Sequence, residues 1–434
     1  MRHAVRKYGL AGGATPGIVP LSRSLNFPHS EPTTMPNLWV SSLACTVLLS
    51  AAVGQHYVST IDVAWPNTSG VGSTTLFARV HYPAVANTTT AALQTSPDGY
   101  PVVVFLHGFG MLGNDYSRLG DSLSAAGFVA VMLNTAQYSY TQMEDDARAI
   151  YDGIAAANSQ PDGFFEGQLQ VDRVGLLGHS MGGAVIAYVL NADPTAPAVS
   201  PGYSCGLALA PVNPSIAIAG TMVQVPLGLV SGQGDILTPP ALHAVPYYNS
   251  LAPSQGLKFH YQMGPSCTHM NMVGLTTSNP AVYDRTSGIA VGFFGQFLGD
   301  SFAGLDAVLG PDGLNDPNLA NLDMDAAVPQ TWASADLSIG MTTRVSVAAE
   351  NGFAGLLAAQ TTSVAIPTLW GPLLLDPTSA FSIAESYIVG ERLDVFLTVP
   401  NTPGLVGVTF AVQGAGATIN SGFRLGSAIN FVIK

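Results

Sequence analysis

The sequence predicts an α/β domain with a mostly parallel sheet, followed by a smaller all-β domain. Between residues 100 and 298, apolar strand-like runs alternate with helix-like segments, the pattern of a parallel sheet covered on both faces. Within that region a G-x-S-x-G motif, Gly178 to Gly182, separates a strand-like run from an apolar helix-like run. From Leu337 onward only short strand-like runs occur, which is typical of a β-sandwich.

Residues 1–54 are predicted to be a leader with a signal segment. The stretch from Leu38 to Val53 is apolar and ends in small residues suited to cleavage, and basic residues lie upstream. We therefore expect a protein that is secreted or held at the cell surface. An uncleaved membrane anchor is the alternative, but the stretch is shorter than the roughly 20 residues that a span needs.

The predicted α/β domain covers residues 55–300. It opens with two antiparallel strands between Ile61 and Ala84, because a Pro-Asn-Thr-Ser-Gly turn interrupts two apolar runs. Further runs are apolar enough for buried parallel strands, and loops and helix-like segments separate them. The clearest of these runs span residues 101–106, 171–177, 225–231 and 257–263. No long insertion interrupts this alternation, so we expect no large lid.

Ser180 is the candidate nucleophile. A sharp strand-to-helix turn lifts its oxygen above the sheet, and a Cβ at either flanking glycine would clash. A serine hydroxyl attacks a carbonyl only when a base takes its proton and an acid orients that base. In the fold that uses this turn, the acid and then the base follow the serine along the chain.

Asp235 and His269 are the candidates for acid and base. Asp235 follows the run 225–231, at the carboxyl end of a predicted strand, and His269 lies in the loop after the run 257–263. The rival aspartates precede the serine and are predicted on or beside helices; they are Asp115, Asp121, Asp145 and Asp146. We expect structural or surface roles for four further histidines, namely His107, His179, His243 and His260.

The loop that follows the run 101–106 is the predicted site for a developing oxyanion. It reads His-Gly-Phe-Gly-Met and begins at His107. Acyl transfer needs donors aimed at the negative oxygen, and backbone amides at such a loop and after the nucleophile supply them. We therefore predict the N–H groups of Phe109 and Met181 as the oxyanion hole. An ordinary glycine-rich turn is the alternative.

From about Val58 to Leu298 the chain resembles the dienelactone-hydrolase-like branch of the α/β-hydrolases. Within that branch it resembles bacterial cutinases and polyester hydrolases, and more distantly plant chlorophyllases. The matching segments are Gly108–Phe109, Ala126–Val129, Gly178–Gly183, Pro246–Leu251 and Thr268–His269. The resemblance implies an α/β-hydrolase fold and hydrolysis of apolar or polymeric carboxylic esters through an acyl-enzyme on Ser180.

Other functional interpretations of the same residues remain open. A lipase or a chlorophyllase-like esterase would use the same groups as a cutinase. A surface-binding protein built on an inactive hydrolase fold is the alternative outside enzymes.

Two departures from cutinases bear on the substrate. The resemblance implies an acyl-binding aromatic at position 109, where cutinases usually have tyrosine and this chain has Phe109. Val212 stands where cutinases usually have a tryptophan, and we treat Phe109 and Val212 as candidate substrate-binding residues. The C-terminal disulfide of cutinases has no matching cysteine pair, since the chain has only Cys45, Cys205 and Cys267.

Residues 301–336 read as an acidic linker rich in Gly, Pro and Asn, and residues 337–434 as a β-rich accessory domain. Aspartates scattered in the linker make a calcium site conceivable, but their spacing does not match an EF-hand. The aromatic residues Trp332, Phe353, Trp370 and Tyr387 could form a surface-binding platform, although core packing is the commoner role.

Composition narrows the possible partners. The formal net charge is −13 and only 9% of residues are charged, so a nucleic-acid partner, which needs a basic face, is not expected. The predicted serine chemistry needs no metal and no organic cofactor. We expect a monomer whose partner is an ester substrate, with surface attachment possible through the β-rich domain.

Overall fold

The computed structural model describes residues 56–434 except 89, 136, 192–201, 215–222, 252–255, 300, 302–303, 350–351, 389–391 and 419–421. The predicted leader and Cys45 therefore lie outside the described residues. Within the described residues, no helix has the length and apolar character to cross a membrane.

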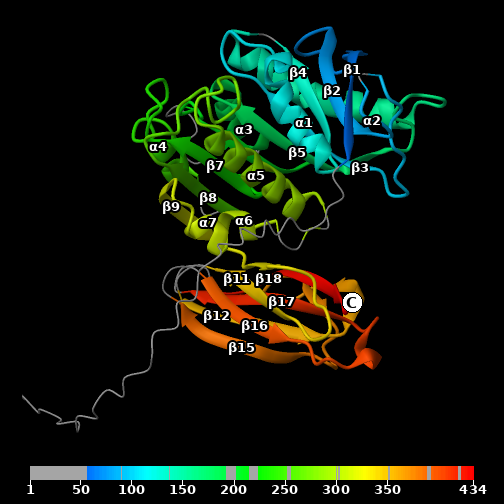
Figure 1. Ribbon diagram of the computed structural model, residues 1–434, viewed down its shortest axis with the longest axis vertical. Helices are drawn as coiled ribbons and strands as arrows, with labels where there is room; N and C mark the ends of the chain where they lie inside the picture. The colour runs from blue at the N-terminus through cyan, green and yellow to red at the C-terminus, as the bar shows by residue number, and fades with distance from the viewer. Residues whose placement is uncertain are drawn as a thin grey trace, which may run out of the picture. The chain divides into compact units, whose positions relative to one another are not determined.

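A nine-stranded sheet forms the α/β domain, in the order β1-β2-β4-β3-β5-β6-β7-β8-β9 (Figure 1). The strands from β4 through β8 in this order pair in parallel, and β1, β2 and β9 pair antiparallel with their neighbours. The mostly parallel sheet predicted from the sequence is thus confirmed. The strands are β1 (Tyr57–Pro66), β2 (Thr75–Ala84), β3 (Tyr100–Leu106), β4 (Val129–Asn134), β5 (Leu169–His179), β6 (Tyr203–Leu209), β7 (Leu227–Gly232), β8 (Leu257–Met263) and β9 (Leu319–Ala326).

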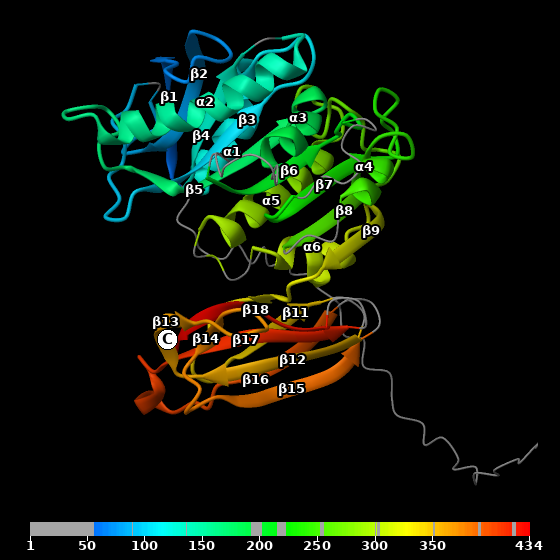
Figure 2. The same cartoon turned by 180° about the vertical axis from the view of Figure 1, so that it is seen from behind.

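Helices cover both faces of this sheet. Successive side chains of a strand point to opposite faces, and both faces of β3 are apolar. Val102 and Val104 pack in the core that includes α2 and α3, whereas Val103 and Phe105 pack in the core that includes α1 and α5. Figures 1 and 2 show these helices along the sheet. The helices are α1 (Ser117–Ala125), α2 (Tyr140–Ser159), α3 (Met181–Leu190), α4 (Ala244–Ser250), α5 (Pro280–Phe297), α6 (Asp306–Leu309) and α7 (Pro311–Leu314).

The segment predicted as a linker holds regular structure. It contains α6, α7 and β9, and β9 extends the sheet by pairing with β8. Asp325 lies 3.3 Å from the ammonium of Lys258, and Asp323 faces His260 across the strand pair. Asp325 is therefore a counter-charge to Lys258 on β8, whereas burial lowers the pKa of His260 to about 4 and leaves that ring neutral at neutral pH. Composition alone did not reveal these contacts.

The C-terminal part is all β, as predicted. A three-stranded and a four-stranded antiparallel sheet share one apolar core, to which β11, β12, β17 and β18 contribute residues such as Val347, Leu356, Val412 and Phe431. A two-stranded ribbon, β13-β14, completes it. The strands are β10 (Gln330–Ala333), β11 (Thr342–Ala348), β12 (Gly352–Ala359), β13 (Thr361–Ile366), β14 (Leu373–Leu375), β15 (Phe381–Ile388), β16 (Arg392–Thr398), β17 (Thr409–Thr418) and β18 (Gly422–Val432).

Trp332 on β10 lies in the core and not on a platform. It is fully buried with Leu305 and Val308, and its indole N–H donates to Asp306 on α6. Arg344 on β11 forms an ion pair with the same carboxylate. The other three aromatic residues considered for a platform, Phe353, Trp370 and Tyr387, are exposed.

Replacement of Gly182 by alanine is expected to lower the free energy of unfolding by about 1–3 kcal/mol, because the new Cβ would overlap the backbone carbonyl of Leu106. Gly288 on α5 is the matched control, since nothing lies within 4 Å of a Cβ there. Gly288→Ala should leave stability unchanged or raise it by about 0.5–1 kcal/mol. Urea denaturation measures both, and equal effects at the two sites would contradict the packing argument.

Candidate active site

Ser180 lies at the turn where β5 ends and α3 begins. Its backbone has φ 54° and ψ −113°, a strained conformation that persists only where the surroundings hold it. A Cβ on Gly178 would lie 2.5 Å from the carbonyl oxygen of Gly182. Close backbone approach therefore requires glycine at both ends of the motif. Ser180, at the start of α3, is 8% exposed.

Asp235 follows β7 and is buried in a shell of donors. Its Oδ1 accepts hydrogen bonds from the backbone N–H groups of Leu237 and Thr238, each at 2.8 Å. Its Oδ2 accepts from the Thr238 hydroxyl and from His269 Nδ1, each at 2.7 Å. Burial by itself raises the pKa of Asp235, but the hydrogen bonds from His269 and Thr238 outweigh burial and lower the pKa to about 2. The group is a carboxylate at neutral pH.

His269 lies in the loop after β8, and its ring is oriented by Asp235. Because Nδ1 donates to the carboxylate, Nε2 of the neutral ring keeps a free lone pair. The ring lies 4.5 Å from that of His179, centroid to centroid, and His179 Nε2 lies 3.0 Å from the His269 carbonyl oxygen. Since His179 directly precedes Ser180, these contacts place the predicted base beside the elbow.

The predicted oxyanion loop lies against the same elbow. The N–H of Gly182 donates to the His107 carbonyl at 3.2 Å, and a Cβ on Gly108 would lie 3.4 Å from the Ser180 Cβ. Among the described residues, no acceptor binds the N–H of Phe109 or of Met181. Both amides are therefore available to an oxygen bound next to Ser180, which is the requirement for an oxyanion hole.

Exposed apolar side chains lie next to two of the predicted site residues. Phe109 is 62% exposed and packs edge-on against Tyr138, with ring centroids 5.0 Å apart. Ile236, next to the predicted acid, is 88% exposed, and Leu237 is exposed as well. Val212 is half-buried, and its N–H donates to the Ser180 carbonyl at 3.0 Å.

Sequence reasoning missed several of these contributors. An apolar Ile-Leu pair in a loop, at 236–237, was a readable signal for an exposed binding rim. Thr238, three residues after the acid, was a second signal, because a hydroxyl at that spacing often bonds back to an aspartate. Nothing in the sequence connected Tyr138 to Phe109.

The rival aspartates have other partners or lie elsewhere. Asp115 accepts from the Leu112 N–H, Asp121 pairs with His81, Asp146 is buried and accepts from Ser73, and Asp145 lies on α2. The remaining histidines also have structural roles. His107 contacts the carbonyls of Gly108 and Thr135, His243 precedes α4 and accepts from the Asn213 N–H, and His260 bonds to Ser231.

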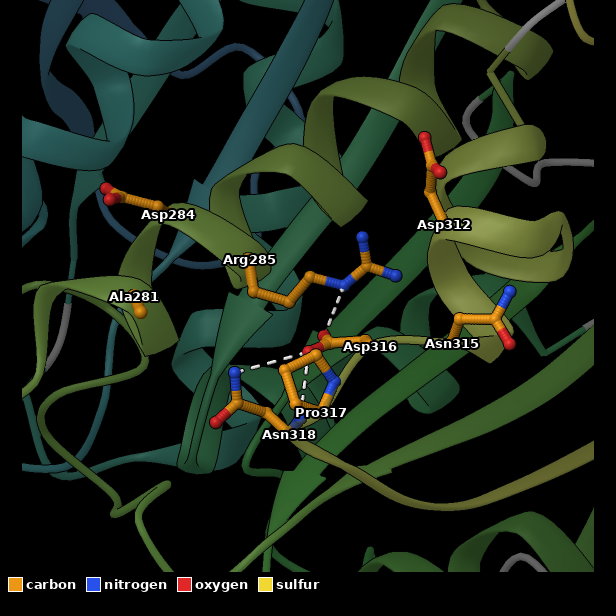
Figure 3. A pocket seen from close by; sticks show the side chains of 8 residues that line it. All are labelled: Ala281, Asp284, Arg285, Asp312, Asn315, Asp316, Pro317 and Asn318. Atoms are coloured by element: carbon orange, nitrogen blue, oxygen red, sulfur yellow. Dashed lines mark hydrogen bonds and ion pairs between the residues drawn. The ribbon is translucent and has the colours of Figure 1, made fainter. Parts of the chain in front are cut away.

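A separate pocket contains none of the predicted catalytic residues. The start of α5, α7 and the following loop line it (Figure 3). Arg285 dominates it but is already paired with Asp316 at 2.8 Å, and it also donates to the Ala307 carbonyl. Its charge therefore holds the segment after α5 and is not left for a ligand.

The depressed pKa of Asp235 predicts a specific dependence of stability on pH. A carboxylate whose pKa falls on folding stabilises the protein above its unfolded pKa of about 3.9, and this contribution is lost as the pH falls through about 2. Asp235→Asn lacks this contribution. The free energy of unfolding of the wild type relative to Asp235→Asn should therefore drop by about 2 kcal/mol between about pH 6 and pH 2. A difference that stays constant in urea titrations across this range would contradict the assignment.

Comparison with known proteins identifies a family and several similar proteins. The PET hydrolase-like family model matches residues 43–279, more than half of the chain, and the match includes Ser180, Asp235 and His269. Similar proteins are a bis(hydroxyethyl) terephthalate hydrolase from Streptomyces coelicolor, cutinase 1 from Thermobifida cellulosilytica and a cutinase from Thermobifida fusca, each 26% identical. The matches cover 48% of this chain in each case and 58%, 70% and 60% of the three relatives, respectively.

The family match ends before the C-terminal β domain, whereas the nine-stranded sheet and the elbow at Ser180 lie largely within it. The chain thus belongs to the PET hydrolase-like family, a group of cutinase-like α/β-hydrolases.

Proposed function

We propose that the protein is a secreted serine carboxylic-ester hydrolase that acts on apolar or polymeric esters. The observation that carries the proposal is the 2.7 Å hydrogen bond between His269 Nδ1 and Asp235, beside a strained serine and two unoccupied backbone amides. Membership in the PET hydrolase-like family supports the same reaction class.

The proposed reaction uses the chain's own side chains. His269 Nε2 takes the proton from Ser180 Oγ as Oγ attacks the ester carbonyl carbon, and the N–H groups of Phe109 and Met181 bind the oxygen that becomes negative. Collapse of this intermediate breaks the bond to the alkoxy oxygen, which leaves as an alcohol with the proton from His269. Water, deprotonated by His269, then attacks the acyl carbon. The bond between that carbon and Ser180 Oγ breaks, His269 returns the proton to Oγ, and the acid is released. Asp235 stabilises the imidazolium at each proton transfer.

The apolar rim supports the substrate class. Phe109 with Tyr138, and Ile236 with Leu237 directly after Asp235, expose apolar surface next to the predicted site residues. An ester with an apolar acyl or aromatic group gains by covering this surface, whereas a charged acid would lose hydration there.

The β domain supports a second proposal, attachment to the surface of a solid ester. Cross-strand pairing places Tyr387 on β15, Phe353 on β12, Ala417 on β17 and Phe423 on β18 in one row across the four-stranded sheet. Tyr387 is 73% and Phe353 41% exposed, and Trp370 packs edge-on against Phe423, with ring centroids 5.6 Å apart. Neighbouring strands lie about 4.8 Å apart, so this row is an extended strip of mostly aromatic side chains that an apolar surface could contact.

The first test is hydrolysis of short- and long-chain p-nitrophenyl esters and of a polyester film by the wild type and Ser180→Ala. Ser180→Ala should fold normally and lower kcat/KM by at least about 10³-fold, because the nucleophile is lost. Residual activity would come from the oxyanion amides and the binding rim, which remain. Activity confined to long acyl chains would indicate a lipase, and activity confined to small soluble esters would indicate an esterase. A folded wild type without activity on any ester would favour a binding protein on an inactive hydrolase fold.

The second test separates the role of the acid. Asp235→Asn should lower kcat by about 10⁴-fold with little change in KM, because the amide no longer holds the imidazole tautomer that can accept the serine proton. Asp121→Asn is the control, since Asp121 is paired with His81 and lies outside the proposed site. Equal losses in the two variants would contradict the assignment of Asp235.

The third test concerns the aromatic strip. Tyr387→Ala combined with Phe353→Ala should weaken adsorption to polyester film by about tenfold and leave hydrolysis of soluble esters unchanged. Point variants are preferred to truncation, because Trp332 and Arg344 of the β domain contact Asp306 on α6. Phe396→Ala, an exposed phenylalanine on β16 of the other sheet, is the matched control. Unchanged adsorption in the double variant would exclude the strip.

A further inference from the structure

We propose that Tyr116 is a positioning residue for ester hydrolysis, acting through a buried hydrogen-bond chain that runs from the oxyanion loop through His179 to the backbone of His269. The inference rests on the proposed function, and it concerns residues that do not touch substrate.

The chain consists of three hydrogen bonds. The N–H of Gly108 donates to the Tyr116 hydroxyl at 3.1 Å, and that hydroxyl lies 2.9 Å from His179 Nδ1. His179 Nε2 in turn lies 3.0 Å from the carbonyl oxygen of His269. The side chains of Tyr116 and His179 are buried, so no solvent competes for these groups.

Chemistry allows one direction for the protons in this chain. A carbonyl oxygen can only accept, so His179 carries its hydrogen on Nε2 and donates it to His269. Nδ1 of the neutral ring must then accept, so the Tyr116 hydroxyl donates to it while its oxygen accepts from Gly108. Every polar group in the chain is paired only in this arrangement.

Burial keeps the chain in that single state. Burial, reinforced by the nearby His269, lowers the pKa of His179 to about 3, so the ring stays neutral around neutral pH. Burial also raises the pKa of the Tyr116 hydroxyl well above its usual range, so the hydroxyl keeps its proton. The hydrogen-bond chain therefore keeps one protonation state around neutral pH.

The positions of Gly108, His179 and His269 explain why this hydrogen-bond chain would matter for the reaction. Gly108 directly precedes Phe109, whose amide is proposed to bind the oxyanion, and His179 directly precedes Ser180. The third contact is to the backbone of His269 itself. One chain thus links the backbones that carry donor, nucleophile and base, and small displacements among such groups can cost about 100-fold in rate.

Tyr116→Phe removes only the hydroxyl and keeps the ring, which packs against Phe105 with ring centroids 4.5 Å apart. We expect kcat, normalised to active serines titrated with a p-nitrophenyl phosphonate, to fall by about 10- to 100-fold with KM within about twofold. Tyr203→Phe is the matched control, because Tyr203 is also buried and its hydroxyl donates to the Ala147 carbonyl at 2.5 Å, away from the site. It should lose stability comparably and keep kcat.

Variants of His179, which bonds to Tyr116, allow a rescue of kcat by a conservative substitution and a double-mutant cycle. His179→Gln keeps one acceptor and one donor and should retain more of the kcat than His179→Leu, which keeps neither. Adding Tyr116→Phe to His179→Leu should cause no further loss if the two residues act through one chain. Additive losses would overturn the proposal, as would an unchanged kcat in Tyr116→Phe.

A measurement on the wild type covers the case in which a variant does not fold. Nitrogen-15 NMR of the histidine rings should show His179 as the neutral Nε2–H tautomer throughout about pH 5 to 9. A titrating ring or the Nδ1–H tautomer would overturn the chain. A wild type that hydrolyses no ester would remove the proposed function itself, whereas an active wild type with an unaffected Tyr116→Phe would overturn this inference alone.

Discussion

The turn at Ser180 constrains the position of every other group in the site. Because β5 passes into α3 without side chains at positions 178 and 182, the helix backbone lies against the end of β3. β3 and β5 are paired in the sheet, so the loop after β3 is brought beside the serine by strand pairing. The strain at Ser180 is offset by α3, whose apolar side chains are almost all buried between sheet and neighbouring helices.

Burial also shapes the electrostatics on both sides of the serine. Asp235 is buried but receives enough donors to stay charged, whereas His179 is buried with donors and acceptors that suit only its neutral form. Of two ionisable groups in one small region, Asp235 is thus held charged and His179 is held neutral. His269 contacts both, because its Nδ1 bonds to Asp235 and its ring lies against that of His179.

Far from the serine, carboxylates form ion pairs that connect separate segments of the chain. Asp325 meets Lys258, Asp316 meets Arg285 and Asp306 meets Arg344, and these pairs attach β9, the segment after α7 and β11 to neighbouring elements. In a chain with few charged residues, such pairs define which segments lie together. In the β domain, strand alternation sends Leu356 inward and Phe353 outward, so one strand contributes to a core and to an exposed aromatic strip.

The sequence by itself determined the parallel sheet, the elbow at Ser180 and the expectation that Asp235 and His269 follow at strand ends, because these features depend on local turns and on apolar runs. Tertiary structure decided the rest. β9 pairs with a strand more than fifty residues earlier, the Thr238 hydroxyl donates to Asp235 and lies 3.0 Å from the Ala210 carbonyl oxygen, and Tyr116 meets His179 at the end of β5. Such contacts depend on strand register and loop approach, which residue order does not encode in any local pattern.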